Sequence, residues 1–102
     1  MSDYNPLDTD SRQAKSKTDA EKAKQAQRQE ADDVKWLMSN PRGRRVCQRF
    51  LERSGVYRSS FNTNGMTMAF NEGMRNEGLR LLASINAVCP DLYLTLLKET
   101  NE

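Results

Sequence analysis

The sequence predicts an all-α protein, a compact domain of three to four helices with a polar N-terminal helical arm. In the second half of the chain, apolar residues recur at the three- and four-residue spacing of helices. Asn40-Pro41 and Pro90 interrupt these runs as helix boundaries do. No alternating strand pattern or strand-flanked hairpin dipeptide competes. With 102 residues and 29% of them charged, the chain has room for one small core.

The first third of the chain is polar, with almost no large apolar side chain after Leu7. We therefore expect a flexible polar tail over residues 1–17 and a helical arm over 18–33. Thr18-Asp19-Ala20-Glu21 matches a capping box, and no Gly or Pro follows until Pro41. These features predict a first helix over about 18–39, weakly held in its first half.

The helical core domain is predicted over residues 34–102, and its first apolar anchors lie in the run Val34–Met38. A second helix is expected from Pro41 to about Ser54, because Asn40 can cap free amides and Gly55 can end the helix. One face of this helix is apolar and is predicted to meet the core; it comprises Val46, Cys47, Phe50 and Leu51.

A loop over residues 55–65 is expected to be held to the core by Val56, Tyr57 and Phe61. The third helix should begin near Met66 and end before Pro90, and a short fourth helix should follow over 91–97. One side of the third helix is apolar: Phe70, Met74, Leu81, Ile85 and Val88. Gly73 and Gly78 weaken a helix, so we expect another helix or a partner to approach closely at both.

The methionines and the single tryptophan have two interpretations each. Met38, Met66, Met68 and Met74 are predicted to fill the core rather than line a plastic partner groove. Trp36 is either a core anchor or an interface residue, and its burial separates the two.

Positive charge is concentrated in the middle of the chain. Residues 34–65 hold 7 basic and 1 acidic side chains, a net +6, whereas residues 1–33 and 66–102 each have a net charge of −2. Arg42, Arg45, Arg49 and Arg53 fall within about 80 degrees of one another on the second helix. Arginines in the first turns of a helix oppose its dipole, so an anion there would relieve a repulsion.

The arginine stripe is either a solvated face, paired with acidic groups of other helices, or a surface that binds an anionic partner. For the second interpretation the candidate binding residues are Trp36, Arg42, Arg44, Arg45, Arg49, Arg53 and Arg58.

Catalysis, cofactors and metals are not expected. The chain has no histidine, and Cys47 and Cys89 are too far apart for a zinc motif. The run Asn71–Gly78 could hold an active-site carboxylate at Glu72, but we interpret it as inter-helix polar contacts. No long apolar run predicts a membrane span, and the N-terminus has no signal-peptide pattern, so we expect an intracellular product with reduced cysteines.

The segments WLMSNPRGRRVCQRFLERSGVYRSSF (Trp36–Phe61), FNEGMRNEGLRLL (Phe70–Leu82) and CPDLY (Cys89–Tyr93) resemble a small family of proteins from short-tailed bacteriophages, of the kind first catalogued in a Bordetella phage. The resemblance covers about residues 33–97. It implies a virion-associated or assembly role, and it carries no enzymatic activity with it. Cys47 stands where the family usually has a larger apolar or aromatic residue.

These observations predict a non-enzymatic phage protein that binds other virion proteins, in the portal or tail region, through its arginine stripe and N-terminal arm. It would reside in the virion, and in the host cytoplasm during expression; a homo-oligomer is compatible with the sequence. One alternative is a small regulator that inhibits a host protein. Another is binding of packaged DNA, which the isoelectric point near 8.7 and the acidic flanking segments disfavour.

Overall fold

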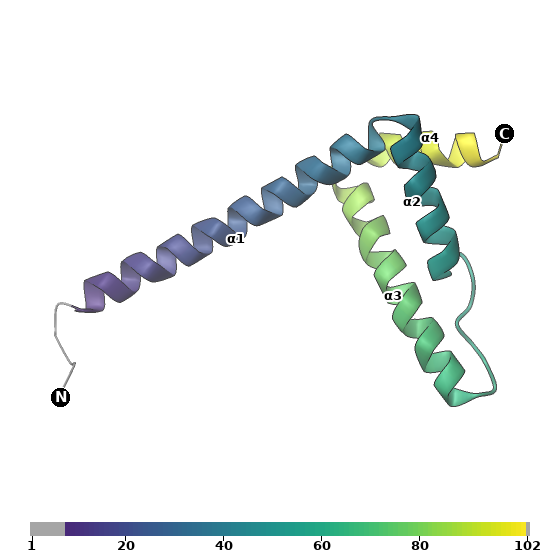
Figure 1. Ribbon diagram of the computed structural model, residues 1–102, viewed down its shortest axis with the longest axis horizontal. Helices are drawn as coiled ribbons and strands as arrows, with labels where there is room; N and C mark the ends of the chain where they lie inside the picture. The colour runs from purple at the N-terminus through teal and green to yellow at the C-terminus, as the bar shows by residue number, and fades with distance from the viewer. Residues whose placement is uncertain (1–7, 102) are drawn as a thin grey trace. The chain divides into compact units, whose positions relative to one another are not determined.

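The computed structural model describes the backbone over residues 8–101 and the side chains over residues 16–101. This range contains no strand, which confirms the prediction of an all-α fold (Figure 1). None of the helices described is long and apolar enough to cross a membrane. The helices are α1 (Asp8–Met38), α2 (Pro41–Ser54), α3 (Gly65–Val88) and α4 (Pro90–Thr100).

The chain divides into two units, Met1–Glu30 and Ala31–Glu102. In the first unit, all side chains from residue 16 to residue 30 are exposed. The helix there follows from its Ala, Lys, Gln and Glu content, since these residues have high helix propensity. It begins at Asp8, so the predicted start at residue 18 is wrong, and Thr18 lies inside the helix rather than capping it. Residues 1–7 of the predicted tail lie outside the described residues.

In the second unit, α2 packs against α3, and α4 contacts both (Figure 1). The last turns of α1 complete this core, where Val34 and Leu37 are half-buried and Trp36 is exposed. The core therefore forms where the C-terminal part of α3 meets the other helices. Its buried apolar side chains are Met38, Cys47, Ile85, Cys89 and Leu96.

Both cysteines of the core are free and buried. Burial raises the pKa of both thiols, and the proximity of Cys89 adds to the rise in the pKa of Cys47. The charge of Lys35 opposes the rise in the pKa of Cys89. The two side chains therefore remain protonated at neutral pH and pack as small apolar groups.

The helix boundaries follow local chemistry. Asn40 Oδ1 accepts a hydrogen bond from the Gly43 amide at 2.8 Å, and Pro41 occupies the first turn, which confirms the predicted start of α2. Gly55 ends α2 in the left-handed conformation, with φ 84°. Helix α4 includes Pro90 and extends to Thr100, three residues beyond the predicted end at 97.

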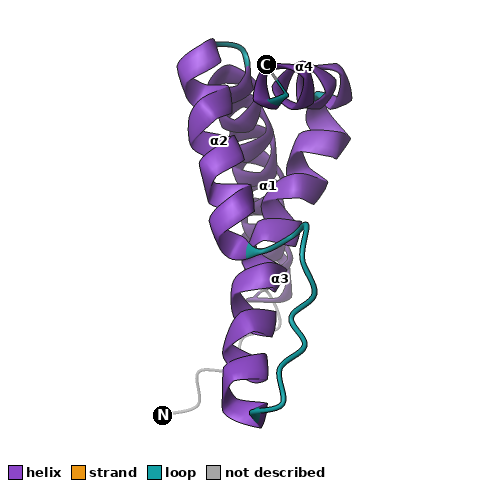
Figure 2. Ribbon diagram, turned by 90° about the vertical axis from the view of Figure 1, so that its right-hand side faces the viewer, coloured by secondary structure: helices purple, strands orange, loops and turns teal. Residues whose placement is uncertain are grey.

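The loop between α2 and α3 runs alongside the first turns of α3 (Figure 2). Only Val56 of its three predicted anchors is buried; Tyr57 is 53% exposed and Phe61 is 74% exposed. Polar contacts hold the loop instead, because the hydroxyl groups of Tyr57 and Tyr93 are hydrogen-bonded at 2.9 Å and the Ser60 hydroxyl donates to Glu72. Burial, followed by the bond to Tyr93, raises the pKa of Tyr57 above its usual range.

The two glycines of α3 occupy different environments. A Cβ at Gly78 would overlap Ser54 and Val56, so the predicted close approach at this position is confirmed. A Cβ at Gly73 would meet no described atom within 4 Å. Within the described residues no other helix approaches Gly73, and the partner alternative at this position stays a prediction.

Candidate functional site

Helix α2 presents two opposite sides. Its buried side consists of Gly43, Cys47, Leu51 and Ser54. The prediction that Val46 and Phe50 join this side is wrong, because they are 53% and 44% exposed. The end of α1 packs closely against the first turn of α2, because a Cβ at Gly43 would overlap the Leu37 carbonyl.

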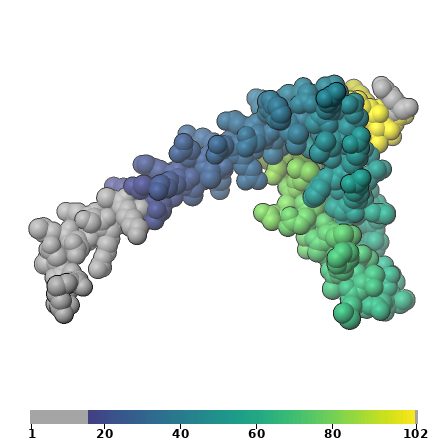
Figure 3. Space-filling model, in the orientation of Figure 1, coloured from purple at the N-terminus to yellow at the C-terminus, as the bar shows by residue number. Residues whose placement is uncertain are grey.

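The outward side of α2 combines arginines with apolar side chains; we call it the arginine face and define it as Arg42, Arg45, Val46, Arg49, Phe50 and Arg53. All six are exposed, and Figure 3 shows α2 at the surface of its unit. None of the four arginines forms a hydrogen bond or ion pair with the residues that the structure describes. The alternative in which acidic groups of other helices neutralise the stripe therefore finds no support in this range.

Arg44 has a different environment from Arg42 and Arg45, the other two arginines of the segment SNPRGRR (residues 39–45). Its Nε lies 2.5 Å from Glu99 Oε1 on α4, and its Nη1 donates to the Met38 carbonyl at 2.9 Å. The side chain is only 12% exposed. Arg44 thus joins α2 to α4 and satisfies a free carbonyl at the end of α1. Arg44 therefore has a structural role and lies outside the exposed arginine face, and its predicted binding role stays a prediction.

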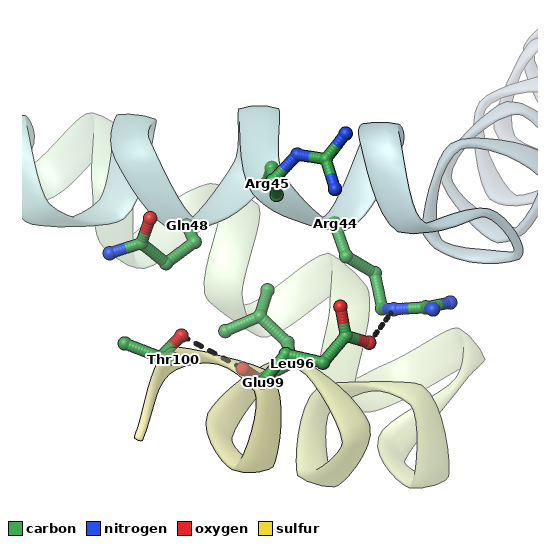
Figure 4. Close-up of a pocket in the computed structure, with 6 residues that line it drawn as sticks. All are labelled: Arg44, Arg45, Gln48, Leu96, Glu99 and Thr100. Atoms are coloured by element: carbon green, nitrogen blue, oxygen red, sulfur yellow. Dashed lines mark hydrogen bonds and ion pairs between the residues drawn. The ribbon is translucent and has the colours of Figure 1, made fainter. Parts of the chain in front are cut away.

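The close-up in Figure 4 shows the same contrast beside a hollow between α2 and α4. Arg44 points from α2 to Glu99, whereas the adjacent Arg45 makes no bond to Glu99. Gln48, Leu96 and Thr100 complete the lining. The hydroxyl of Thr100 donates to the Leu96 carbonyl within α4, at 2.8 Å, so it is already engaged.

Replacing Arg44 by alanine is expected to lower the free energy of unfolding by about 1–3 kcal/mol, because two hydrogen bonds of a largely buried charged group are lost. Arg45→Ala is the matched control and should change stability by less than about 0.5 kcal/mol, since Arg45 is exposed and unpaired. Urea unfolding followed by circular dichroism measures both. Equal effects of the two substitutions would show that the Arg44–Glu99 contact does not stabilise the fold.

The other two predicted binding residues, Trp36 and Arg58, belong to segments that precede and follow α2 in the chain. Trp36, on α1, is 72% exposed, which excludes the core-anchor interpretation. Arg58, in the loop after α2, is exposed and donates through Nη2 to the Glu52 carbonyl at 2.9 Å. This bond satisfies a carbonyl at the end of α2 and holds the guanidinium in place.

Sequence reasoning missed a second exposed apolar region on the first turns of α3 and the preceding loop. Met66 is 85% exposed, Phe70 66% and Phe61 74%. Met68 and Met74 are also exposed, at 37% and 38%, so the prediction that they fill the core holds only for Met38. The lengths of the two helices could have indicated this region. Helix α3 has 24 residues and α2 has only 14, so α2 is too short to cover α3 along its whole length.

Comparison with known proteins gives one family. The family described as "Bbp19-like phage protein" matches residues 34–98, which include all of α2 and α3 and the arginine face. Neither the search of curated proteins nor the search of solved structures gave a match. The match covers more than half of the chain and agrees with the resemblance of the PRGRR segment and the residues after Phe70. The chain therefore belongs to the Bbp19-like phage proteins.

Proposed function

We propose that this phage protein is a non-enzymatic, virion-associated or assembly protein that binds an acidic surface of another virion protein through its arginine face. The observation that carries the proposal is the composition of that face: four unpaired arginines lie beside exposed Val46 and Phe50 on α2. Glu52 is the one acidic side chain of α2, and no ion pair joins it to these arginines. The four positive charges therefore outnumber it and repel one another, so a negatively charged partner stabilises them.

The apolar side chains favour a protein partner over nucleic acid. Binding to a phosphate backbone requires charge, and exposed Val46 and Phe50 add little to it. Protein interfaces, in contrast, are enriched in arginine and aromatic residues and exclude water at their centres. Phe50 and Arg53 are one helical turn apart on α2, so one acidic and apolar surface can engage both.

The N-terminal arm supplies a second contact in this proposal. Its described side chains, from residue 16 to residue 30, are all exposed, so the helix buries none of them within its own unit. The partner that we propose is a virion protein of the portal or tail region. A host protein bound after infection, packaged DNA and a second copy of the chain are the alternatives that the experiment below separates.

The test compares two charge-reversed phages. Arg49→Glu with Arg53→Glu should reduce the amount of the protein in purified particles at least tenfold by quantitative mass spectrometry, because the arginine face then repels an acidic partner. Arg80→Glu with Lys98→Glu changes the net charge equally at exposed positions outside the face and should leave the amount unchanged. Thermal melts confirm that both variants fold.

Two results would contradict the proposal. Absence of the wild-type protein from particles would exclude the virion role and favour the host regulator. Normal incorporation of the Arg49/Arg53 variant would exclude the arginine face as the contact. Sedimentation with short duplex DNA addresses the DNA alternative, since a shift at low salt that disappears at physiological salt would indicate phosphate binding. Sedimentation of the protein alone reports self-association.

A further inference from the structure

A second cationic site lies away from the arginine face, where Arg75 of α3 meets the loop after α2. Arg75 is half-buried, and its Nε is enclosed without a hydrogen-bond partner. No hydrogen bond or ion pair joins its guanidinium to any residue between 16 and 101. The obvious partner, Glu72, lies one turn away on α3 but accepts the hydroxyl of Ser60 instead.

Arg75 and residues 56–60 of the loop line an open hollow of about 410 Å³. No acidic side chain belongs to the lining, which holds two guanidinium groups and three hydroxyl groups. Arg58 is oriented by its bond to the Glu52 carbonyl, and Ser59 accepts the Phe61 amide at 3.1 Å, so its hydroxyl hydrogen remains available as a donor. The lining residues are Val56, Tyr57, Arg58, Ser59, Ser60 and Arg75.

The arrangement lacks an acceptor. A guanidinium N–H removed from water without a hydrogen bond destabilises the fold, and a charged group raises that cost. Two arginines beside one hollow also repel each other. A group with several negatively charged oxygens would accept from the terminal nitrogens of both guanidiniums, since the enclosed Nε of Arg75 is out of its reach. Such charge-assisted bonds are about twice as strong as neutral ones.

We propose that this hollow binds an oxyanion, a phosphate or a carboxylate group, between Arg58 and Arg75. Arg75 supplies the principal contact, since it has no other partner within the described residues. Arg58 and the hydroxyl of Ser59 complete the donor set. The site does not depend on the arginine face, so it can bind its ligand whether or not the proposed virion contact exists.

The test uses the full-length protein labelled with ¹⁵N and follows the arginine Nε–Hε signals. The probes are sodium phosphate and a tetrapeptide of glutamate, each compared with sodium chloride at equal ionic strength. We expect one probe to shift the Arg75 signal saturably and to raise the melting temperature, because a ligand of the folded state stabilises it. A response to phosphate identifies a phosphoryl ligand, and a response to the peptide identifies an acidic protein segment.

Variants locate the binding. Arg75→Gln should weaken the affinity for the active probe at least tenfold, and Arg58→Gln should weaken it severalfold. Arg80→Gln is the matched control on the same helix, because Arg80 is exposed and pairs with Glu77 at 3.2 Å. It should bind as the wild type does. If Arg75→Gln does not fold, the affinity of Arg58→Gln and the shift of the Arg75 signal in the wild type still show whether the hollow binds the probe.

The proposal is overturned if neither probe shifts the Arg75 signal beyond the effect of chloride. Undiminished binding by both Arg58→Gln and Arg75→Gln would overturn it as well. These results concern only the hollow. They do not bear on whether the Arg49 and Arg53 variants are incorporated into particles. Failure of this inference is therefore distinguishable from failure of the proposed virion role.

Discussion

Replacing Ile85 by alanine is expected to lower the free energy of unfolding by about 3 kcal/mol, within the range for buried aliphatic residues cut back to alanine. The Ile85 side chain is fully buried in α3. It lies in the same cluster as Met38 of α1, Cys47 of α2 and Leu96 of α4. The cavity left by its removal therefore weakens contacts to three helices at once. Urea unfolding monitored by circular dichroism measures the loss.

Phe70→Ala is the matched control, because Phe70 lies on the same apolar stripe of α3. It is 66% exposed, so its truncation should change stability by less than about 0.5 kcal/mol despite the larger side chain. A loss comparable to that of Ile85→Ala would show that Phe70 is buried in the folded protein in solution. The ratio of the two losses of stability thus tests how far along α3 the buried core extends.

This contrast shows what helical periodicity could and could not predict. Phe70, Ile85 and Val88 share one side of α3, and the spacing correctly indicated a helix. Periodicity records which residues share a face, but whether another helix covers that face depends on tertiary packing. Here α2 is much shorter than α3, so the stripe is buried at Ile85 and exposed at Phe70.

The same limit applies to the arginine face. On a helical wheel of α2, two adjacent rows of apolar side chains appear. One row contains Cys47 and Leu51, and the other contains Val46 and Phe50. Sequence alone could not decide between them, because both have helical spacing. The tertiary packing decides, since it buries Cys47 and Leu51 and leaves Val46 and Phe50 exposed. Local chemistry was more predictable, as the Asn40 cap and the Gly55 stop show.

The role of Arg44 could not be read from the sequence either. Arg44 and Arg45 are adjacent residues of one type, and only the path of α4 places Glu99 beside the first. The contact spans 55 positions of the chain, which no local pattern encodes. The sequence shows that arginines cluster on α2, but which of them are exposed and unpaired required the structure.

Replacing Gly78 by alanine is expected to lower the free energy of unfolding by about 2 kcal/mol or more, because the added methyl group has no space. A Cβ at this position would lie 2.5 Å from Val56 Cγ1 and 2.7 Å from Ser54 Cβ. Neither neighbour can retreat easily, since Gly55 between them is fixed at φ 84° as the cap of α2. Thermal and urea unfolding measure the effect.

Gly73→Ala is the control, since it makes the same change on the same helix at a position where a Cβ would meet no described atom within 4 Å. Alanine is the better helix former, so this variant should be more stable than the wild type by about 0.5–1 kcal/mol. The two substitutions are thus expected to have opposite signs, which helix propensity alone cannot produce. If Gly78→Ala also stabilised the protein, α2 would not approach α3 closely at Gly78. The loop that holds Arg58 over the Arg75 hollow would then lose its anchor, because Val56 is the residue of that loop that packs against Gly78.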